Sequence, residues 1–317
     1  MGTIPAFESF AVRKTREAER AAIYPLATLE DHSSRYPLER IGNPWTHQMY
    51  DGPFHPVRLA ALPRGVSAAT SPPEMPAISL VFVQSKDGNT GTDNPAALGG
   101  GATDTHLIYE GLSRVAVDAV LAGATTAAGR DVFFSLWHPQ LVALRASLEL
   151  PRHPTQIVLT GRACIDPETS LIFNVPDVPA IVLGSVYACG VLAKAAASRP
   201  WMHIIPMEGD DPSPALRRLF QDFGIRRISC IGGRTTASAM IDRGLVQDIC
   251  LTTTHREAGE ANTPFYVGGN PPVLEPIVRK RCTDPDAPFL FEHLYMRTER
   301  REVTGEGEKK RTTILDI

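Results

Sequence analysis

Cysteine is scarce and scattered in this chain of 317 residues. No C-x-x-C pair occurs, which argues against the common zinc-binding patterns, and an odd, sparse set does not form the disulfide framework of a small secreted domain. We therefore expect no metal site, and free thiols in a reducing cytoplasm. The five cysteines are Cys164, Cys189, Cys230, Cys250 and Cys282.

Long apolar runs and excess positive charge are also missing. No stretch approaches the run of about 20 apolar residues that crosses a membrane, and residues 1–24 lack the apolar core of a signal peptide. The formal net charge is −3, which implies no basic surface and makes nucleic acid an unexpected partner. With 43% hydrophobic and 21% charged residues, the composition is that of an ordinary globular protein and excludes a disordered or fibrous one.

Three common active-site motifs are absent as well. The sequence has no G-x-G-x-x-G after an expected strand, no Walker A motif and no G-x-S-x-G elbow. The run His255-Arg256-Glu257 fits the first half of a zinc deaminase motif, but no P-C-x-x-C follows it, so we expect no metal there.

The chain divides into three parts by composition and hydrophobic pattern. Residues 1–74 are rich in proline and show no sustained hydrophobic periodicity, which predicts an irregular extension with one short helix near Val12–Ile23. The extension is expected to end at Ser71-Pro72-Pro73. Residues 75–300 alternate apolar runs of strand length with helical patterns. Residues 301–317 form a polar tail.

The alternation in the central part predicts an α/β fold with a mostly parallel, doubly wound sheet. The last strand, Leu290–Met296, follows no helix, which indicates an antiparallel strand or hairpin at the C-terminal end. The other expected strands are Ile78–Val83, Asp118–Gly123, Gln156–Thr160, Ala180–Leu183, His203–Met207, Arg226–Ile231 and Asp248–Thr254. The expected helices begin at Thr103 or Asp104, with Ile108, Leu112 and Val115 on the buried face, and then cover Tyr187–Ala197, Pro214–Phe223 and Thr235–Arg243.

Short polar or glycine-rich segments follow several of these strands, at the edge where open α/β sheets bind ligands. Gly232 and Gly233 join a strand to a helix, where a missing Cβ lets a phosphate approach the backbone N–H groups. We expect positive φ in this turn; the alternative is a tight turn without a ligand. The segments are Ser85–Gly88, Gly99–Gly101, Gly123–Thr126, Thr160–Arg162 and Gly232–Thr235.

This ordered set resembles the reductase domain of riboflavin biosynthesis, the RibD C-terminal family, which shares the dihydrofolate reductase fold. The resemblance covers about two-thirds of the chain, from Ala77 to Arg297. It rests on the S-x-D-G turn, the R-x-x-x-D-A strand entry, the following G-x-x-T turn and the late G-G turn. These are Ser85–Gly88, Arg114 with Asp118–Gly123, Thr126, Gly232-Gly233 and Leu245–Asp248.

The resemblance implies NADPH as the cofactor. Gly123 and Thr126 would contact it near the nicotinamide and its phosphates, and the turn formed by Gly232, Gly233, Arg234 and Thr235 would hold the pyrophosphate. Thr160 and Arg162 would meet the adenosine 2′-phosphate, for which a guanidinium is well suited. An exposed loop arginine is the alternative interpretation of Arg162.

The resemblance also places Asp87 against the substrate as the catalytic candidate, beside Ser85 and Ile231; an ordinary Asp-Gly turn is the alternative. Family members commonly have glutamate at 231 and a basic residue at 89, whereas this chain has Ile231 and Asn89. No general acid is evident. Arg114 and Asp118 are expected to pair for structural reasons.

The resemblance implies hydride transfer from NADPH to a small heterocyclic or sugar-linked substrate, as in 5-amino-6-(5-phosphoribosylamino)uracil reductase. Two alternatives stay open: a pterin reductase of the same fold, or a non-catalytic NADPH-binding relative. The resemblance further implies a homodimer. Residues 1–74 are too short for the zinc deaminase that bifunctional relatives carry.

Overall fold

A computed structural model describes residues 5–56, 75–90, 98–257, 263–269, 271–282 and 291–299. Its strands are β1 (Leu26–Asp31), β2 (Ala77–Gln84), β3 (Ala119–Gly123), β4 (Thr155–Thr160), β5 (Ala180–Gly184), β6 (Met202–Pro206), β7 (Arg227–Cys230), β8 (Asp248–Thr254), β9 (Val273–Cys282) and β10 (Phe291–Glu299). Its longer helices are α1 (Pro5–Arg20), α2 (Pro44–Tyr50), α6 (Pro139–Ser147), α7 (Val186–Ala197), α8 (Ser213–Phe223) and α9 (Arg234–Asp242). Shorter ones are η1 (Ser33–Arg35), α4 (Gly101–Thr103), α5 (Ala124–Ala127) and η3 (Leu171–Phe173), and α4 continues into the π-helical η2 (Asp104–Leu112).

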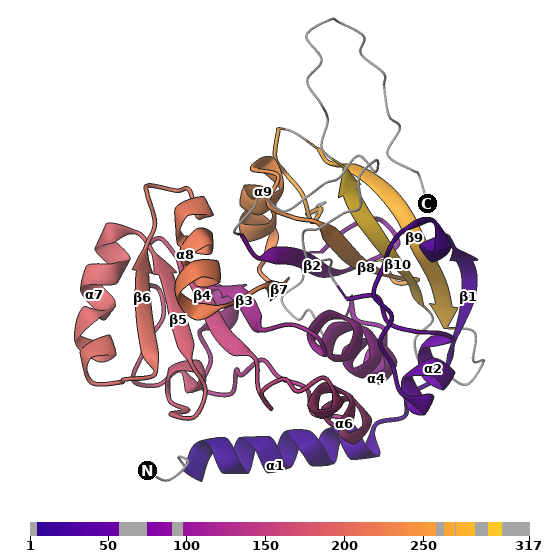
Figure 1. The fold of residues 1–317 in the computed structure, drawn as a ribbon, viewed down its shortest axis with the longest axis horizontal. Coiled ribbons are helices and arrows are strands. Elements are labelled where there is room, and N and C mark those ends of the chain that lie inside the picture. The colour runs from indigo at the N-terminus through magenta and orange to yellow at the C-terminus, as the bar shows by residue number, and fades with distance from the viewer. Residues whose placement is uncertain are drawn as a thin grey trace, which may run out of the picture.

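The described strands form one ten-stranded sheet in the order β1-β9-β10-β8-β2-β7-β3-β4-β5-β6 (Figure 1). The seven strands from β8 to β6 are parallel, and β10, β9 and β1 add antiparallel pairs at one end. The expected α/β class, with a mostly parallel sheet and an antiparallel C-terminal part, is confirmed.

Helices cover both faces of this sheet because its inner strands alternate buried side chains between two cores. In β3, Ala119 and Leu121 belong to the core that α8 and α9 cover, whereas Val120 and Ala122 face η2 and α6. This period of two is the pattern of a strand buried on both faces.

Residues 5–56 contain more regular structure than the sequence predicts. The helix expected near residues 12–23 spans Pro5–Arg20, and β1 pairs with β9 in the sheet. Asn43 starts α2 with a reciprocal capping box, in which its side chain accepts from the backbone N–H of Thr46. The expected boundary at 71–73 and the tail at 301–317 lie outside the described residues.

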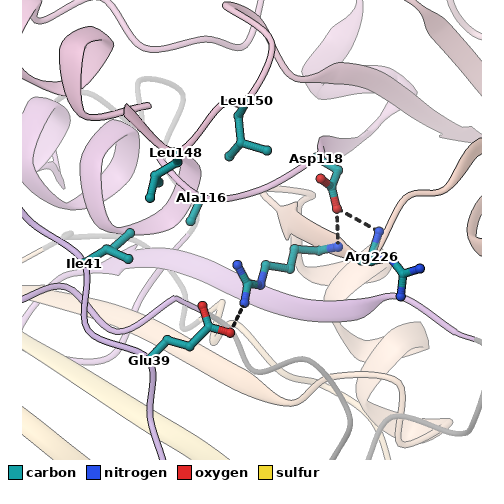
Figure 2. A pocket seen from close by; sticks show the side chains of 8 residues that line it. Glu39, Ile41, Ala116, Asp118, Leu148, Leu150 and Arg226 are labelled. Atoms are coloured by element: carbon teal, nitrogen blue, oxygen red, sulfur yellow. Dashed lines mark hydrogen bonds and ion pairs between the residues drawn. The ribbon is translucent and has the colours of Figure 1, made fainter. Parts of the chain in front are cut away.

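At the edge where the parallel strands begin, Asp118 joins β3 to β7 (Figure 2). Its Oδ2 accepts hydrogen bonds from the backbone N–H groups of Arg226, at 2.8 Å, and Arg227, at 2.9 Å. The expected pairing of Asp118 with Arg114 is wrong, because the Arg114 guanidinium lies 3.8 Å from the Tyr109 ring centroid. A cavity of about 260 Å³ opens at this edge, away from the predicted ligand segments.

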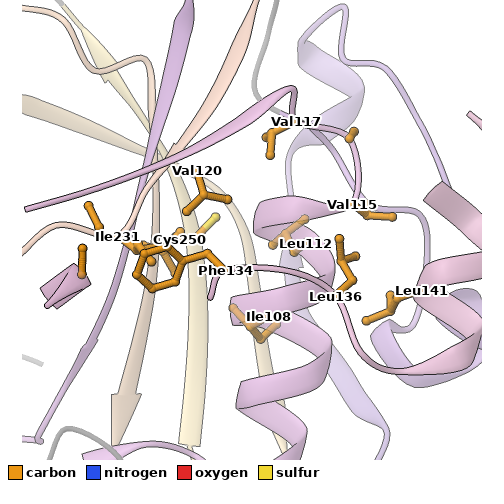
Figure 3. Close-up of a cluster of buried hydrophobic side chains, with 14 of the residues drawn as sticks. Ile108, Leu112, Val115, Val117, Val120, Phe134, Leu136, Leu141, Ile231 and Cys250 are labelled. Carbon is orange, nitrogen blue, oxygen red and sulfur yellow. The ribbon is translucent and has the colours of Figure 1, made fainter. Parts of the chain in front are cut away.

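The hydrophobic core between the sheet and η2 confirms the predicted buried helix face (Figure 3). Ile108, Leu112 and Val115 are all at most 5% exposed. They share a cluster with Ile231 at the end of β7 and Cys250 on β8, so this core extends toward the edge that carries the predicted ligand segments.

Candidate functional site

The parallel strands bring four of the five predicted segments together at one edge. Strands β2, β7, β3 and β4 are consecutive neighbours in the sheet. The segments that begin at Ser85, Gly232, Gly123 and Thr160 follow these strands in that order. Segments separated by up to about half of the chain in sequence therefore lie side by side, because the carboxyl ends of parallel strands share an edge.

The glycine turn stands in the middle of this edge. A Cβ built on Gly232 would lie 2.8 Å from Thr236 Cβ, and one built on Gly123 would lie 3.2 Å from Thr236 Oγ1. These two glycines are thus required for close packing of β7 and β3 against the first turn of α9. By contrast, a Cβ on Gly233 would meet nothing within 4 Å.

The backbone of this turn corrects one expectation. Gly233 is the N-cap of α9 with φ −62° and ψ 172°, and neither Gly232 nor Gly233 has positive φ. The helix receives no side-chain cap. Its first N–H groups therefore face the open space at Gly233, where the helix dipole favours an anion.

The remaining residues predicted for this part of the cofactor site are exposed. Arg234 and Thr235 lie on the first turn of α9, and Thr126 lies on α5, directly after β3. Their side chains are available to a ligand at this edge.

The loop after β4 presents Arg162 to solvent. Thr160 is buried, and its Oγ1 accepts from the backbone N–H of Ala163 at 3.0 Å, so it shapes the loop from within. Ser185, the N-cap of α7, donates its hydroxyl to the Gly161 carbonyl at 2.6 Å and holds the loop against β5.

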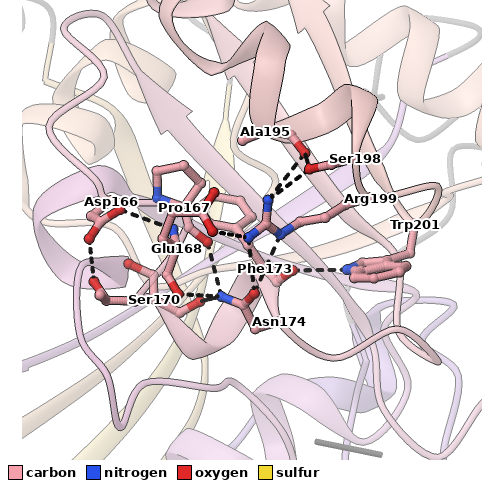
Figure 4. A network of polar contacts seen from close by, with 11 residues as sticks. Asp166, Pro167, Glu168, Ser170, Phe173, Asn174, Ala195, Ser198, Arg199 and Trp201 are labelled. Atoms are coloured by element: carbon pink, nitrogen blue, oxygen red, sulfur yellow. Dashed lines mark hydrogen bonds and ion pairs between the residues drawn. The ribbon is translucent and has the colours of Figure 1, made fainter. Parts of the chain in front are cut away.

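A buried arginine anchors the far part of the same loop (Figure 4). Arg199 Nη2 donates to Glu168 at 2.8 Å, and the Arg199 guanidinium also contacts Asn174 Oδ1. The Asn174 amide in turn donates to the Ser170 carbonyl at 2.9 Å. This network fixes the chain that follows Arg162.

The turn after β2 separates its residues into buried and exposed. Ser85 is fully buried, and its Oγ accepts from the backbone N–H of Asn89 at 3.1 Å, so it fixes the turn. Asp87 is exposed at the tip, before Gly88 with φ 78°. Asn89 is also fully buried and accepts a hydrogen bond from the Thr263 hydroxyl, so its side chain holds a neighbouring segment.

Ile231 follows the last residue of β7 and directly precedes the glycine turn. It is 7% exposed, belongs to the core shown in Figure 3, and donates its backbone N–H to the Leu121 carbonyl at 2.9 Å. A buried, apolar side chain therefore occupies the position before the glycine turn.

The fifth segment, Gly99–Gly101, serves packing. A Cβ on Gly100 would lie 2.3 Å from the Phe291 ring, so only glycine fits there. This packing places the start of the helix formed by α4 and η2 beneath the end of β8, since Phe291 pairs with Thr254.

Sequence reasoning treated Asp104 only as a possible helix cap, but the structure shows a buried acid. The carboxyl is 7% exposed and accepts from Thr252 Oγ1 at 2.6 Å and from the Gly100 N–H at 3.3 Å. Burial raises the pKa of Asp104 to about 6, although both hydrogen bonds lower it. No local sequence signal marks this burial, because its hydrogen-bond partner Thr252 is 148 residues away in the chain.

Within the described ranges, no group of three or more histidine, cysteine, aspartate or glutamate side chains could hold a metal ion. Among the same residues, none of the helices has both the length and the apolar character needed to span a membrane.

A family model described as the RibD C-terminal domain matches residues 76–283. The chain belongs to the RibD C-terminal domain family. The predicted resemblance is confirmed, and residues 76–283 of this RibD-family chain include all four ligand segments at the sheet edge. None of the curated proteins compared with the chain matches it significantly.

Solved structures share the fold at low sequence identity. A pyrimidine reductase-like protein from Corynebacterium diphtheriae is 16% identical, with a TM-score of 0.56 over 71% of this chain and 92% of that one. Acinetobacter baumannii RibD is also 16% identical, with a TM-score of 0.53 over 72% of this chain. The match spans only 59% of that RibD chain.

Proposed function

We propose that this protein is an NADPH-dependent reductase of the pyrimidine reductase type, acting on a small heterocyclic or sugar-linked substrate. The observation that carries the proposal is the edge formed by β2, β7, β3 and β4, with the uncapped start of α9 at its centre. A pyrophosphate could approach the first N–H groups of α9 at Gly233, because a Cβ built there would meet nothing within 4 Å and the helix has no side-chain cap.

In this proposal each segment of the edge binds a different part of the cofactor or substrate. The N–H groups of the first turn of α9 bind the pyrophosphate, and the Arg162 guanidinium binds the 2′-phosphate. Gly123 and Thr126 border the nicotinamide half, while Asp87 accepts hydrogen bonds from substrate hydroxyl or N–H groups. Bound NADPH supplies the hydride, and the protein supplies orientation.

Cofactor choice tests the role of Arg162. We expect Arg162→Ala to raise the NADPH dissociation constant about 10- to 100-fold, because a charge-assisted hydrogen bond is worth about 1.5–3 kcal/mol. NADH lacks the 2′-phosphate and is expected to bind within about twofold of the wild type. Titration of the protein with each cofactor, followed by fluorescence, measures both constants.

Arg234→Ala is the matched control, since Arg234 is also exposed but lies on the first turn of α9, where the pyrophosphate shared by both cofactors is proposed to bind. Equal losses for NADPH and NADH in Arg162→Ala would contradict the assignment. A loss confined to NADPH in Arg234→Ala would move 2′-phosphate recognition to that residue.

The apolar Ile231 predicts poor turnover of the phosphoribosylamino-pyrimidine of riboflavin synthesis. An unpaired polar ring edge against a dry, apolar wall costs about 1–3 kcal/mol, which is about one to two decades of affinity. We expect a less polar acceptor to be reduced faster. NADPH oxidation with a panel of aminopyrimidines and pterins measures this preference, and turnover of the riboflavin intermediate at an ordinary pathway rate would show that Ile231 does not select substrate.

The same assay separates the two alternatives. Fast reduction of a pterin would make the protein a pterin reductase, and NADPH binding without oxidation in any mixture would make it a non-catalytic relative. The homodimer stays a prediction.

A further inference from the structure

The cavity at the edge where the parallel strands begin lies apart from the ligand segments described above. It has a volume of about 260 Å³ and is lined by Asp118, directly before β3, and by Arg227, the first residue of β7 (Figure 2). At a rise of about 3.3 Å per residue, the five residues of β3 place roughly 13 Å of strand between this cavity and Gly123 at the ligand edge.

Two parts of the chain that are distant in sequence form the apolar wall of the cavity. Ile41 belongs to the segment before the family domain, and its backbone exchanges two hydrogen bonds with that of Phe54, at 2.8 and 3.0 Å. Leu148 and Leu150 follow α6, and Figure 2 shows them on the same side of the cavity as Ile41 and Ala116. The wall is thus shared between this segment and the family domain.

Arg145 braces the part of the wall that the family domain supplies. Its guanidinium donates to the carbonyls of Val115 and Val117, the residues on either side of Ala116, at 3.2 and 2.8 Å. Its Nε donates to the Pro151 carbonyl at 2.6 Å, one residue beyond the second wall leucine. The wall is therefore formed before a ligand arrives, so that binding does not have to order it.

The remaining side chains that line the cavity are charged, and Arg227 has donors to spare. Its Nη2 pairs with the Glu39 carboxylate. Within the residues that the structure describes, its Nη1 makes no hydrogen bond, and its Nε is buried without a partner. Since 14% of this side chain is exposed, an acceptor that enters the cavity can complete the hydrogen bonds that the protein leaves unmade.

The charges around the cavity balance. Glu39 and Asp118 are negative, whereas Arg226 and Arg227 are positive. Asp118 Oδ2 already accepts from the two arginine backbone N–H groups, and the Arg226 guanidinium lies 5.1 Å from the Phe220 ring centroid on α8. An anion beside Arg227 would also lie beside the Glu39 carboxylate, and like charges placed together are unfavourable. An uncharged ligand avoids this repulsion.

The size of the cavity limits the ligand to a small molecule. A cavity of about 150 Å³ is enough for a benzene ring, so this one has room for a six-membered ring with one short substituent. The face of the ring matches the apolar wall, and the substituent has to meet the guanidinium and the carboxylate. A carboxamide satisfies both, because its C=O accepts from Arg227 and its N–H donates to Glu39.

We propose that this cavity is a second ligand site, which binds a small, uncharged aromatic or heterocyclic amide. The ring packs against Ile41, Leu148 and Leu150, and the amide bridges Arg227 and Glu39. The site lies at the opposite end of β3 and β7 from the proposed cofactor site, and it does not depend on the reductase function.

Benzamide is the probe, and benzoate, which has nearly the same shape and a negative charge, is its matched control. Titration of the full-length protein at pH 7, followed by NMR of the probe, is expected to show saturable benzamide binding. Benzoate is expected to bind at least about 10-fold more weakly, because it lies against Glu39 without an N–H to donate. Equal or tighter binding of benzoate would overturn the assignment to an uncharged amide.

Two variants alter the two walls separately. Arg227→Met removes the donors and keeps the backbone N–H that bonds to Asp118, and it should weaken benzamide binding about 10- to 100-fold. Leu150→Trp adds bulk to the half-buried apolar wall and should weaken binding at least about 10-fold, although the polar wall stays intact.

The matched controls carry the same substitutions outside the cavity. Arg218→Met on α8 and Leu29→Trp on β1 change exposed residues that do not line it, and both should keep the benzamide dissociation constant within about twofold of the wild type. Urea midpoints show which variants are folded. Because the two cavity variants alter different walls, either one that folds decides the outcome.

Competition with NADPH distinguishes this cavity from the ligand edge. Benzamide should bind equally well with and without NADPH, and displacement by NADPH would place the probe at the ligand edge and overturn the proposal. Absence of benzamide binding to the wild type, or unchanged binding to folded Arg227→Met and Leu150→Trp, would overturn it as well. If the protein does not bind NADPH, the cofactor proposal fails, and the variants still decide this one.

Discussion

Gly233→Val is expected to abolish NADPH binding at concentrations up to at least 100 times the wild-type dissociation constant, with the fold retained. The backbone at Gly233 has φ −62° and ψ 172°, which valine adopts without strain, and a Cβ there meets no protein atom within 4 Å. The valine side chain would instead occupy the space through which a phosphate reaches the first N–H groups of α9.

The neighbouring glycine is the matched control. At Gly232 a Cβ would lie 2.8 Å from Thr236, so Gly232→Val must displace α9 and should lower the free energy of unfolding by about 1–3 kcal/mol. Gly233→Val should change it by less than about 1 kcal/mol. Fluorescence titration with NADPH and urea unfolding measure the two effects, and normal NADPH binding by folded Gly233→Val would show that the turn serves the fold alone.

Arg145→Met is expected to lower the free energy of unfolding by about 4 kcal/mol. The substitution leaves several buried carbonyl groups without a hydrogen-bond donor, and each unpaired group costs about 1–3 kcal/mol. Arg145 is 1% exposed, and its Nη1 donates to the carbonyls of Arg114, Val115 and Val117 at 2.8–3.2 Å. Its Nε donates to the Pro151 carbonyl at 2.6 Å. Although burial lowers the pKa of Arg145 to about 10, the guanidinium stays charged at neutral pH.

Two further variants isolate the cause of this loss. Arg145→Lys keeps a charge but loses the planar fork, so it should recover only part of the stability. Arg218→Met removes an exposed arginine that pairs with Asp222 at 3.0 Å, and it should cost less than about 1 kcal/mol. Equal urea midpoints for Arg145→Met and Arg218→Met would contradict a structural role for the buried fork.

The sequence predicts the inner strands because their signal is local. The apolar run before Gly123 is buried on both faces, and few structures other than a covered strand accommodate such a run at that length. The order of the strands in the sheet could not be predicted in the same way. β7 lies between β2 and β3, and no local sequence pattern indicates that placement.

Strand β9 was not predicted because proline and charged residues interrupt its apolar pattern. Its residues include Pro276, which faces a register shift in β10, and three consecutive basic residues. Lys280 is nevertheless 3% exposed, because its ammonium bonds to Thr28 and to the Asp51 carbonyl. Such partners become visible only in three dimensions.

The same limit applied to the site. Arg162 and Asp87 are exposed, as expected for loop residues at the end of a strand. Asn89 and Asp104 are buried and hydrogen-bonded to Thr263 and Thr252, which are distant in sequence. Burial decides the pKa of a carboxyl, so an acid of this kind cannot be identified from its neighbours in sequence.

The insertion of β7 between β2 and β3 also dictates when this edge can exist during synthesis. Until residues 227–230 emerge from the ribosome, β2 and β3 have no common neighbour. β3 then exposes unpaired backbone groups along one side and β2 along both, because β8, the other partner of β2, also follows β7 in the chain. Chains that stop before residue 227 should therefore form intermolecular β contacts and aggregate. The four residues of β7 thus join β2 to β3 and complete the ligand edge in one long-range step, before β8, β9 and β10 extend the sheet. Such long-range pairing makes folding of this domain slow compared with that of a helical protein of equal length.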